Sequence, residues 1–218
     1  PWSNPVEFTT HNGVEDYDGD GIPDDSEVDD TVDLNQDGIP DNDQPDVIKS
    51  ILSAVGGNEP FGVSKISASI DAIEALEPVN PATILDKTNR PETFLFGLAS
   101  YRLRVSQVGA TVLVRVYYSE DISGANQYYL YDTVNGWQDY TQYTTFNPDG
   151  RSVTVELKDG GQGDSDGVAI SAAFRQGIGC VVMAPGMGIE AIAQLPSLSL
   201  PTPDRSKVPW PDGDLVTD

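Results

Sequence analysis

The sequence has few basic residues, and this shortage excludes several kinds of partner. Its 218 residues include 12 lysines and arginines against 35 aspartates and glutamates, which gives a formal net charge of −23 at pH 7. Nucleic-acid binding depends on patches of lysine and arginine, so we expect no nucleic-acid partner. An anionic membrane surface is disfavoured for the same reason. No apolar run approaches the roughly 18 residues that span a bilayer, so we expect no membrane insertion either.

Histidine and cysteine are also scarce, and this argues against an enzyme and against a disulfide scaffold. His11, the only histidine, stands in an unpatterned lead-in at residues 1–13. A Ser-His-Asp triad or a Cys-His pair needs a histidine fixed within the fold, so neither is expected here. The common metalloprotease, P-loop and nucleophile-elbow motifs are absent, and we expect no catalytic residues. Cys180 is the only cysteine. It lies in an apolar run that favours a buried thiol. One cysteine cannot form a disulfide within the chain, so we expect bound metal ions to supply the cross-links of an exported protein.

Acid is what the sequence has in excess, and it is concentrated near one end. No lysine or arginine precedes Lys49, while residues 14–46 contain two similar runs, "DYDGDGIPDDSE" from Asp16 and "DLNQDGIPDNDQ" from Asp33. Crowded carboxylates repel one another in water. The stretch is therefore either a solvated acidic linker or a segment that metal ions hold together.

The first run matches a twelve-residue calcium loop at every ligand position. A hard cation takes about six to eight oxygen ligands near 2.4 Å, and alternate residues of a tight loop point inward to supply them. Gly21 stands at position six, where the chain must turn sharply. The predicted ligands are Asp16, Asp18, Asp20, the backbone carbonyl of Ile22, Asp24 and Glu27. Magnesium is disfavoured because it prefers stricter octahedral geometry and retains its waters.

The second run is close to the same pattern but departs from it at its last position. Gln44 stands at position twelve, where a bidentate acid is usual, and Asp43 or Asp46 is the alternative ligand there. The predicted ligands are Asp33, Asn35, Asp37, the backbone carbonyl of Ile39, Asp41 and Asp43. Proline at position eight of both loops has no N–H for the β-bridge of paired EF-hands. The runs instead resemble thrombospondin type 3 repeats, in which irregular chain winds around calcium ions.

A third group of aspartates lies far along the chain, in "LKDGGQGDSDGVA". Asp159, Asp164 and Asp166 stand among glycines that allow tight turns, so they can converge on a further metal ion. A long Gly/Asp turn without metal is the alternative. Spacing alone does not decide between the two.

The rest of the chain predicts an antiparallel β-sandwich preceded by the irregular acidic segment. Period-two patterns between Gly, Pro, Asn and Asp predict about nine short strands. They cover residues 62–70, 92–99, 101–106, 110–119, 127–133, 136–143, 152–159, 167–174 and 179–185. In one of them Val112, Val114 and Val116 share an apolar face that should meet the core. Residues 46–56 read as a short helix, with Asp46 as its N-cap and Gly56 as its stop.

These patterns divide the chain into four segments. They are a lead-in (1–13), calcium-binding repeats (14–46), a β-sandwich (47–195) and a proline-rich extended tail (196–218). Exposed aromatic residues can stack on sugar rings, so a carbohydrate-binding domain is the alternative function. Packing within the sandwich is the better interpretation of the aromatics. The residues concerned are Tyr128, Tyr129, Tyr131, Trp137, Tyr140 and Tyr143.

Together, the runs "DLNQDGIPDNDQPDVIKSI", "GATVLVRVYYS", "YYLYDTVNGWQDYT" and "VTVELKDGGQGDSDGVA" resemble the bacterial choice-of-anchor U domain. The resemblance covers about residues 33–188 and is most specific at the final Asp/Gly run. It implies a secreted or surface-exposed bacterial protein, and it adds support for a structural site at Asp159, Asp164 and Asp166. The family has no assigned activity to carry over.

These observations predict an extracellular, calcium-stabilised structural or adhesive module at the bacterial cell surface. Two versions stay open. One is a module within a larger surface architecture that binds other proteins. The other is a subunit that assembles with copies of itself into an extracellular fibre or sheath, with the tail as the joining arm.

Overall fold

The computed structural model describes residues 15–55, 59–165, 174–175 and 178–182. The chain divides into two compact units, Pro1–Gly186 and Met187–Asp218, and all described residues belong to the first. The acidic segment and the strands therefore share one unit. The predicted lead-in and tail lie outside the described residues.

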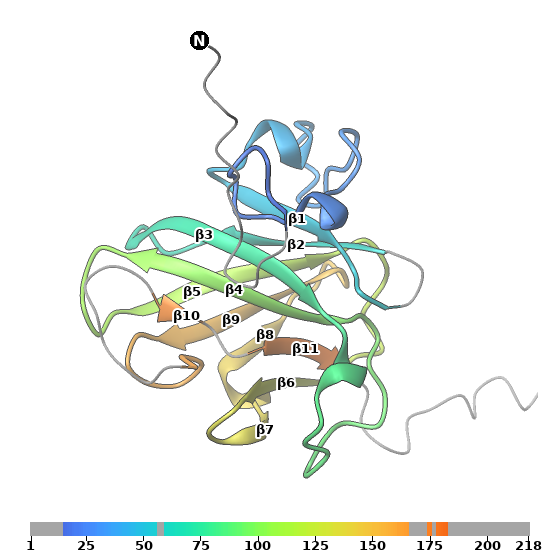
Figure 1. Ribbon diagram of the computed structural model, residues 1–218, viewed down its shortest axis with the longest axis vertical. Helices are drawn as coiled ribbons and strands as arrows, with labels where there is room; N and C mark the ends of the chain where they lie inside the picture. Colours follow the sequence, from blue (N-terminus) through green and yellow to red (C-terminus); the bar gives the residue numbers. More distant parts are fainter. Residues whose placement is uncertain (1–14, 56–58, 166–173, 176–177, 183–218) are drawn as a thin grey trace, which may run out of the picture. The chain divides into compact units, whose positions relative to one another are not determined.

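Antiparallel strands form two sheets, as predicted (Figure 1). The first sheet has the order β1-β2-β5-β9-β8. Its strands are β1 (Ile48–Leu52), β2 (Pro60–Lys65), β5 (Thr111–Tyr118), β8 (Thr144–Phe146) and β9 (Ser152–Lys158). In the second sheet, β4 pairs with β3 on one side and with β10 and β11 on the other, and β6 and β7 follow β11. Its strands are β3 (Ile70–Val79), β4 (Leu98–Val105), β6 (Gln127–Asp132), β7 (Gly136–Asp139), β10 (Phe174–Arg175) and β11 (Ile178–Val182).

One hydrophobic core joins the two sheets into a sandwich. Val112, Val114 and Val116 of β5 are almost completely buried, which confirms the predicted core face of that strand. They belong to the same buried cluster as Leu103 of β4 and Leu130 of β6. Alternation of apolar and polar residues along each strand places one face of each sheet in this core.

Helical structure in the described residues consists of short 3-10 turns. They are η1 (Asp24–Ser26), η2 (Asp41–Asp43), η3 (Pro81–Thr83) and η4 (Thr141–Tyr143). No helix in this part of the chain has the length and hydrophobicity needed to cross a membrane.

The acidic segment contacts the edge strands of both sheets. Glu27 forms a β-bridge with Ile51 of β1, the edge of the first sheet. The Leu76 N–H of β3 donates to the Gly21 carbonyl at 3.0 Å, and Ile22 enters the core with 4% of its surface exposed. Edge strands with free N–H and C=O groups invite pairing with other chains. The acidic segment therefore satisfies backbone groups that would otherwise be open to such pairing.

The predicted helix at residues 46–56 is wrong. Residues Ile48–Leu52 form β1 and pair with β2, with Ile51 opposite Phe61. Both faces of β1 are buried, because the core covers Ile51 and the acidic segment covers Ser50. A strand buried on both faces loses the period-two alternation, and its apolar spacing then resembles that of a helix.

Other strand boundaries also differ from the prediction. The patterns at 62–70 and 92–99 predicted strands, yet β2 ends at Lys65 and β4 begins only at Leu98. The ten-residue β3 and the short β8 were not predicted. β3 contains Ala, Glu and Pro, which are poor strand formers, and its register with β4 shifts twice. Residues 167–173 of the strand predicted at 167–174, and residues 183–185 of the strand predicted at 179–185, lie outside the described residues.

Candidate metal centre

The two acidic runs fold into the same loop, 17 residues apart. We call residues 16–27 the first loop and residues 33–44 the second loop. At position six of each loop the glycine has φ +89°, and at position four a residue also has positive φ. Each loop ends in a 3-10 turn that follows a proline, η1 after Pro23 and η2 after Pro40. The repeat seen in the sequence is therefore a repeat of backbone conformation.

Side-chain hydrogen bonds repeat with the backbone. At position one, Asp16 and Asp33 each accept from the glycine N–H at position six, at 3.2 Å and 2.9 Å. The N–H at position seven donates to the aspartate at position five in both loops, at 2.7 Å and 2.9 Å. The N–H at position two donates to the aspartate at position nine, Asp24 or Asp41. These bonds hold the carboxylates at positions one, five and nine against the main chain of their own loop.

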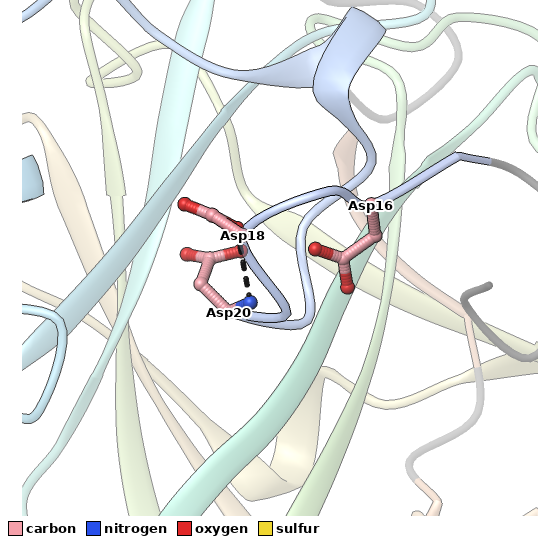
Figure 2. A group of neighbouring side chains, drawn as sticks. All are labelled: Asp16, Asp18 and Asp20. Atoms are coloured by element: carbon pink, nitrogen blue, oxygen red, sulfur yellow. Dashed lines mark hydrogen bonds between the residues drawn. The ribbon is translucent and has the colours of Figure 1, made fainter. Parts of the chain in front are cut away.

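In the first loop three carboxylates converge. One oxygen from each of Asp16, Asp18 and Asp20 lies within 4.8 Å of the other two. Figure 2 shows the Asp16 side chain on one side of the loop and those of Asp18 and Asp20 on the other. Asp16 is buried, Asp18 is exposed and Asp20 is intermediate. Three hard oxygen atoms this close together form a candidate site for a cation.

Glu27, the predicted position-twelve ligand, has an exposed side chain but interacts electrostatically with the three converging aspartates of the first loop. Its pKa is raised above the ordinary value, mainly by partial desolvation and to a smaller extent by repulsion from Asp18 and Asp20. The pKa of Asp16 is also raised, because burial outweighs the hydrogen bonds from Gly19 and Gly21. A cation at the centre would offset the repulsion between these carboxylates and lower their pKa values.

Lys49 is a residue of the first loop's surroundings that sequence reasoning missed. Its side chain is 6% exposed, and its Nζ lies 3.2 Å from Asp20 Oδ2 and also donates to the Asp20 carbonyl. The neighbouring Ser50 donates its hydroxyl to Asp41 of the second loop. Consecutive residues of β1 therefore hold the two loops. The helix expected at 46–56 hid this pairing, and no local signal reveals it.

In the second loop the amide of Gln44 takes the place of an acid. Its Nε2 donates to Asp37 Oδ1 and to the Ile39 carbonyl, both at 3.1 Å, and these are two of the predicted ligands. The hydrogen bond from Ile39 N–H, followed by those from Gln44 and Asn35, lowers the pKa of Asp37. Gln44 thus closes the second loop from position twelve, as Glu27 is placed to close the first.

Asp41 anchors the second loop to the sandwich. Only 1% of its surface is exposed, and it accepts from Leu34 N–H at 3.2 Å and from the Ser50 hydroxyl. Burial raises its pKa, against the effect of these hydrogen bonds. Asp43, the alternative ligand, is exposed at the end of η2. A cavity of about 250 Å³ lies between the loops and includes Asp20, Asp41 and Lys49 in its lining.

The third predicted group is only partly described. Asp159 and Asp164 are buried, with 1% and 7% of their surfaces exposed, in the turn that follows β9. Asp166 lies outside the described residues. The prediction that these three aspartates share a metal ion therefore stays a prediction.

The aromatic group contributes to packing. Tyr128, Trp137 and Tyr140 expose 4% of their surfaces or less. Trp137 packs on Phe94 and Tyr131, and its Nε1 donates to the Asp86 carbonyl at 2.9 Å. These buried rings are not available to stack on a sugar, which favours the packing interpretation.

Comparison with protein-family models, with curated proteins and with solved structures finds no match to this chain.

Proposed function

We propose that this protein is an extracellular structural or adhesive module of a bacterial cell surface, stabilised by calcium bound in its first and second loops. One observation carries the proposal. Two loops 17 residues apart repeat the same backbone turn and the same hydrogen bonds, and in the first loop one oxygen from each of Asp16, Asp18 and Asp20 lies within 4.8 Å of the other two. Oxygen ligands at this spacing suit calcium.

In the first loop, calcium binds Asp16, Asp18, Asp20, the Ile22 carbonyl and Glu27. In the second loop it binds Asp33, Asn35, Asp37 and the Ile39 carbonyl. Asp24 and Asp41, at position nine, accept backbone hydrogen bonds and complete each loop from outside or through water. Each ion neutralises carboxylates that otherwise repel one another.

The binding of calcium stabilises the fold. Metal-binding free energy becomes folding free energy when the site exists only in the folded chain. Here the stabilised segment contacts the edge strands β1 and β3 through Glu27 and Gly21. Calcium therefore keeps two sheet edges covered, and the sandwich presents a rigid surface to its partners.

The chemistry of the chain supports a structural role. Its net charge of −23 disfavours nucleic acid, and it has a single histidine. The resemblance to choice-of-anchor U domains supports secretion and a place at the cell surface. Other surface proteins, or copies of this chain in a fibre or sheath, are the proposed partners.

Calcium stoichiometry tests the proposal. We expect isothermal titration of the chelator-treated chain to show at least two calcium ions, and Asp18→Ala to remove one of them. Asp18 is exposed, and its carboxylate bonds within the loop, where it accepts Asp20 N–H at 3.1 Å and meets the Asp16 carboxyl, so this substitution spares the fold. Asp71→Ala, at an exposed position of β3, is the matched control. An unchanged stoichiometry in Asp18→Ala would reject the first loop as a site.

Sedimentation velocity separates the two versions of the function. Large species that form in millimolar calcium and disappear with excess chelator indicate a self-assembling subunit. A monomer in both conditions, more compact in calcium, indicates a module whose partner is another molecule. An identical sedimentation coefficient in both conditions would contradict a structural role for calcium.

A further inference from the structure

Two buried carboxylates outside the first and second loops, those of Asp159 and Asp164, lie in the turn after β9. Lys158 N–H donates to the Gln162 carbonyl at 2.9 Å, and Gly161 N–H donates back to the Lys158 carbonyl at 2.8 Å, which closes this turn. Asp164 Oδ2 accepts from Gly160 N–H at 2.8 Å. The Asp164 carboxylate therefore lies beside the main chain at the residue that directly follows Asp159.

Asp159 is held in place by the neighbouring turn between β4 and β5. Its Oδ2 accepts from Gly109 N–H at 2.7 Å, and its own N–H donates to the Ala110 carbonyl at 3.0 Å. Only 1% of the residue is exposed. Gly109 N–H thus holds the carboxylate, the Asp159 N–H bond to Ala110 holds the main chain beside it, and the side chain is shut off from bulk solvent.

The other oxygen of this carboxylate has no partner. Asp159 Oδ1 is buried and accepts no hydrogen bond, and no salt bridge among the described residues involves Asp159. Lys158, the nearest basic residue in sequence, is exposed, and its stem packs over Gly161. A buried charged oxygen without a partner is costly, and native proteins rarely leave one unsatisfied.

We propose that the turn of residues 158–164 binds a divalent cation, with Asp159 and Asp164 as its carboxylate ligands. A cation satisfies Asp159 Oδ1 and offsets the charge of two buried carboxylates at once. The ligands are all oxygens on a glycine-rich turn, which suits calcium better than magnesium or a transition metal. The site is separate from the first and second loops and does not depend on them.

Such a site joins two turns that are distant in sequence. Asp159 already bonds the turn between β4 and β5 at Gly109, 50 residues away. A cation held by Asp159 and Asp164 fixes the end of β9 against that turn. It therefore stabilises the sandwich at a place where the acidic segment makes no described hydrogen bond.

Calcium titration of the ¹⁵N-labelled, chelator-treated chain tests this proposal on the unaltered protein. Gly109 N–H and Gly160 N–H bond Asp159 and Asp164 directly, so we expect both amide signals to shift and then saturate. Gly21 and Gly38, which bond Asp16 and Asp33, report on the two loops in the same spectra. Shifts at Gly109 and Gly160 alone would leave this site standing without the proposed function. Shifts at Gly21 and Gly38 alone would overturn this site, and a buried water at Asp159 Oδ1 would then explain the turn.

A substitution gives a second readout. We expect Asp159→Asn to bind one calcium ion fewer than the wild type and to lose the calcium-dependent shift of Gly160. Asp139→Asn is the matched control, because Asp139 is exposed and its side chain accepts the Thr141 N–H at 3.0 Å. An Asp159→Asn variant that keeps the wild-type stoichiometry would overturn the proposal. If the variant does not fold, the wild-type titration still decides.

Discussion

The first and second loops have the same internal structure but meet the sandwich in different ways. The first loop is joined to it through the main chain, since the Gly21 carbonyl accepts from Leu76 N–H and Ile22 is buried in the core. The second loop is joined through side chains, since the buried Asp41 accepts from Ser50 of β1 and Leu34 lies against Gly62 of β2, while Ile39 is 48% exposed. Local sequence therefore sets the loop, and contacts outside it set how much stability each loop lends to the fold.

Substitution of the glycines at position six gives the largest expected difference in folding stability between the two loops. A Cβ at Gly21 would lie 2.1 Å from the Glu74 carbonyl oxygen, whereas a Cβ at Gly38 would meet nothing within 4 Å. Both residues have φ +89°, so alanine strains either backbone by about 1–2 kcal/mol. We expect Gly38→Ala to cost only that strain and Gly21→Ala to cost about 3 kcal/mol or more, because backbone must move. Urea unfolding in calcium measures both, and equal losses would contradict the close contact with β3.

For the aspartates at position nine we expect the opposite result, with the larger loss of stability in the second loop. Asp41→Ala removes acceptors for Leu34 N–H and the Ser50 hydroxyl in a buried place, so we expect a loss of about 2–3 kcal/mol. Asp24→Ala removes one acceptor, that of Tyr17 N–H, near the surface, and should cost less than about 1 kcal/mol. Urea unfolding in excess chelator makes the measurement without a contribution from calcium affinity. A larger loss in Asp24→Ala would show that Asp41 is not the anchor.

Exchange of the residues at position twelve sharpens the comparison. Gln44→Glu supplies the bidentate carboxylate that the second loop lacks, so we expect about tenfold tighter calcium binding there, or about 1.4 kcal/mol. Glu27→Gln should weaken the first loop by a similar factor. Isothermal titration measures both affinities. No gain in Gln44→Glu would mean that position twelve does not face the ion in the second loop.

Lys49 gives the smallest expected effect. Its ammonium group pairs with Asp20 and opposes a second positive charge in the first loop. We expect Lys49→Gln to tighten calcium binding to the first loop about threefold, with a larger gain at low ionic strength because salt screens the repulsion. Lys65→Gln is the control, because Lys65 Nζ donates to the Asp71 carbonyl at 3.1 Å. Weaker binding in Lys49→Gln would mean that Lys49 supports the ligand geometry.

Much of the candidate site could be predicted from the sequence because its interactions are short in range. Asp16 bonds Gly21, five residues away, and Asp41 bonds Leu34, seven residues away. The repeat of Asp, Gly and Pro therefore predicted the repeat of the fold. Alternation likewise predicted β5 and its buried valines, since the period of a strand is also a local property.

The contacts between distant segments could not be predicted in this way. Lys49 and Asp20 are 29 residues apart, and the pairing depends on β1 being a strand at the sheet edge rather than the predicted helix. β3 was missed because its Ala, Glu and Pro residues are poor strand formers that only pairing with β4 holds extended.

The sequence by itself determined the two loops, the placing of oxygen-bearing side chains at alternate positions in them and the strand-rich class of the chain, because each follows from hydrogen bonds and periods within about a dozen residues. The tertiary structure alone decided which loop is built into the sandwich, which basic residue faces it, and that Asp159 Oδ1 is left buried without a hydrogen-bond partner. Those outcomes depend on burial against distant strands, which no local pattern encodes.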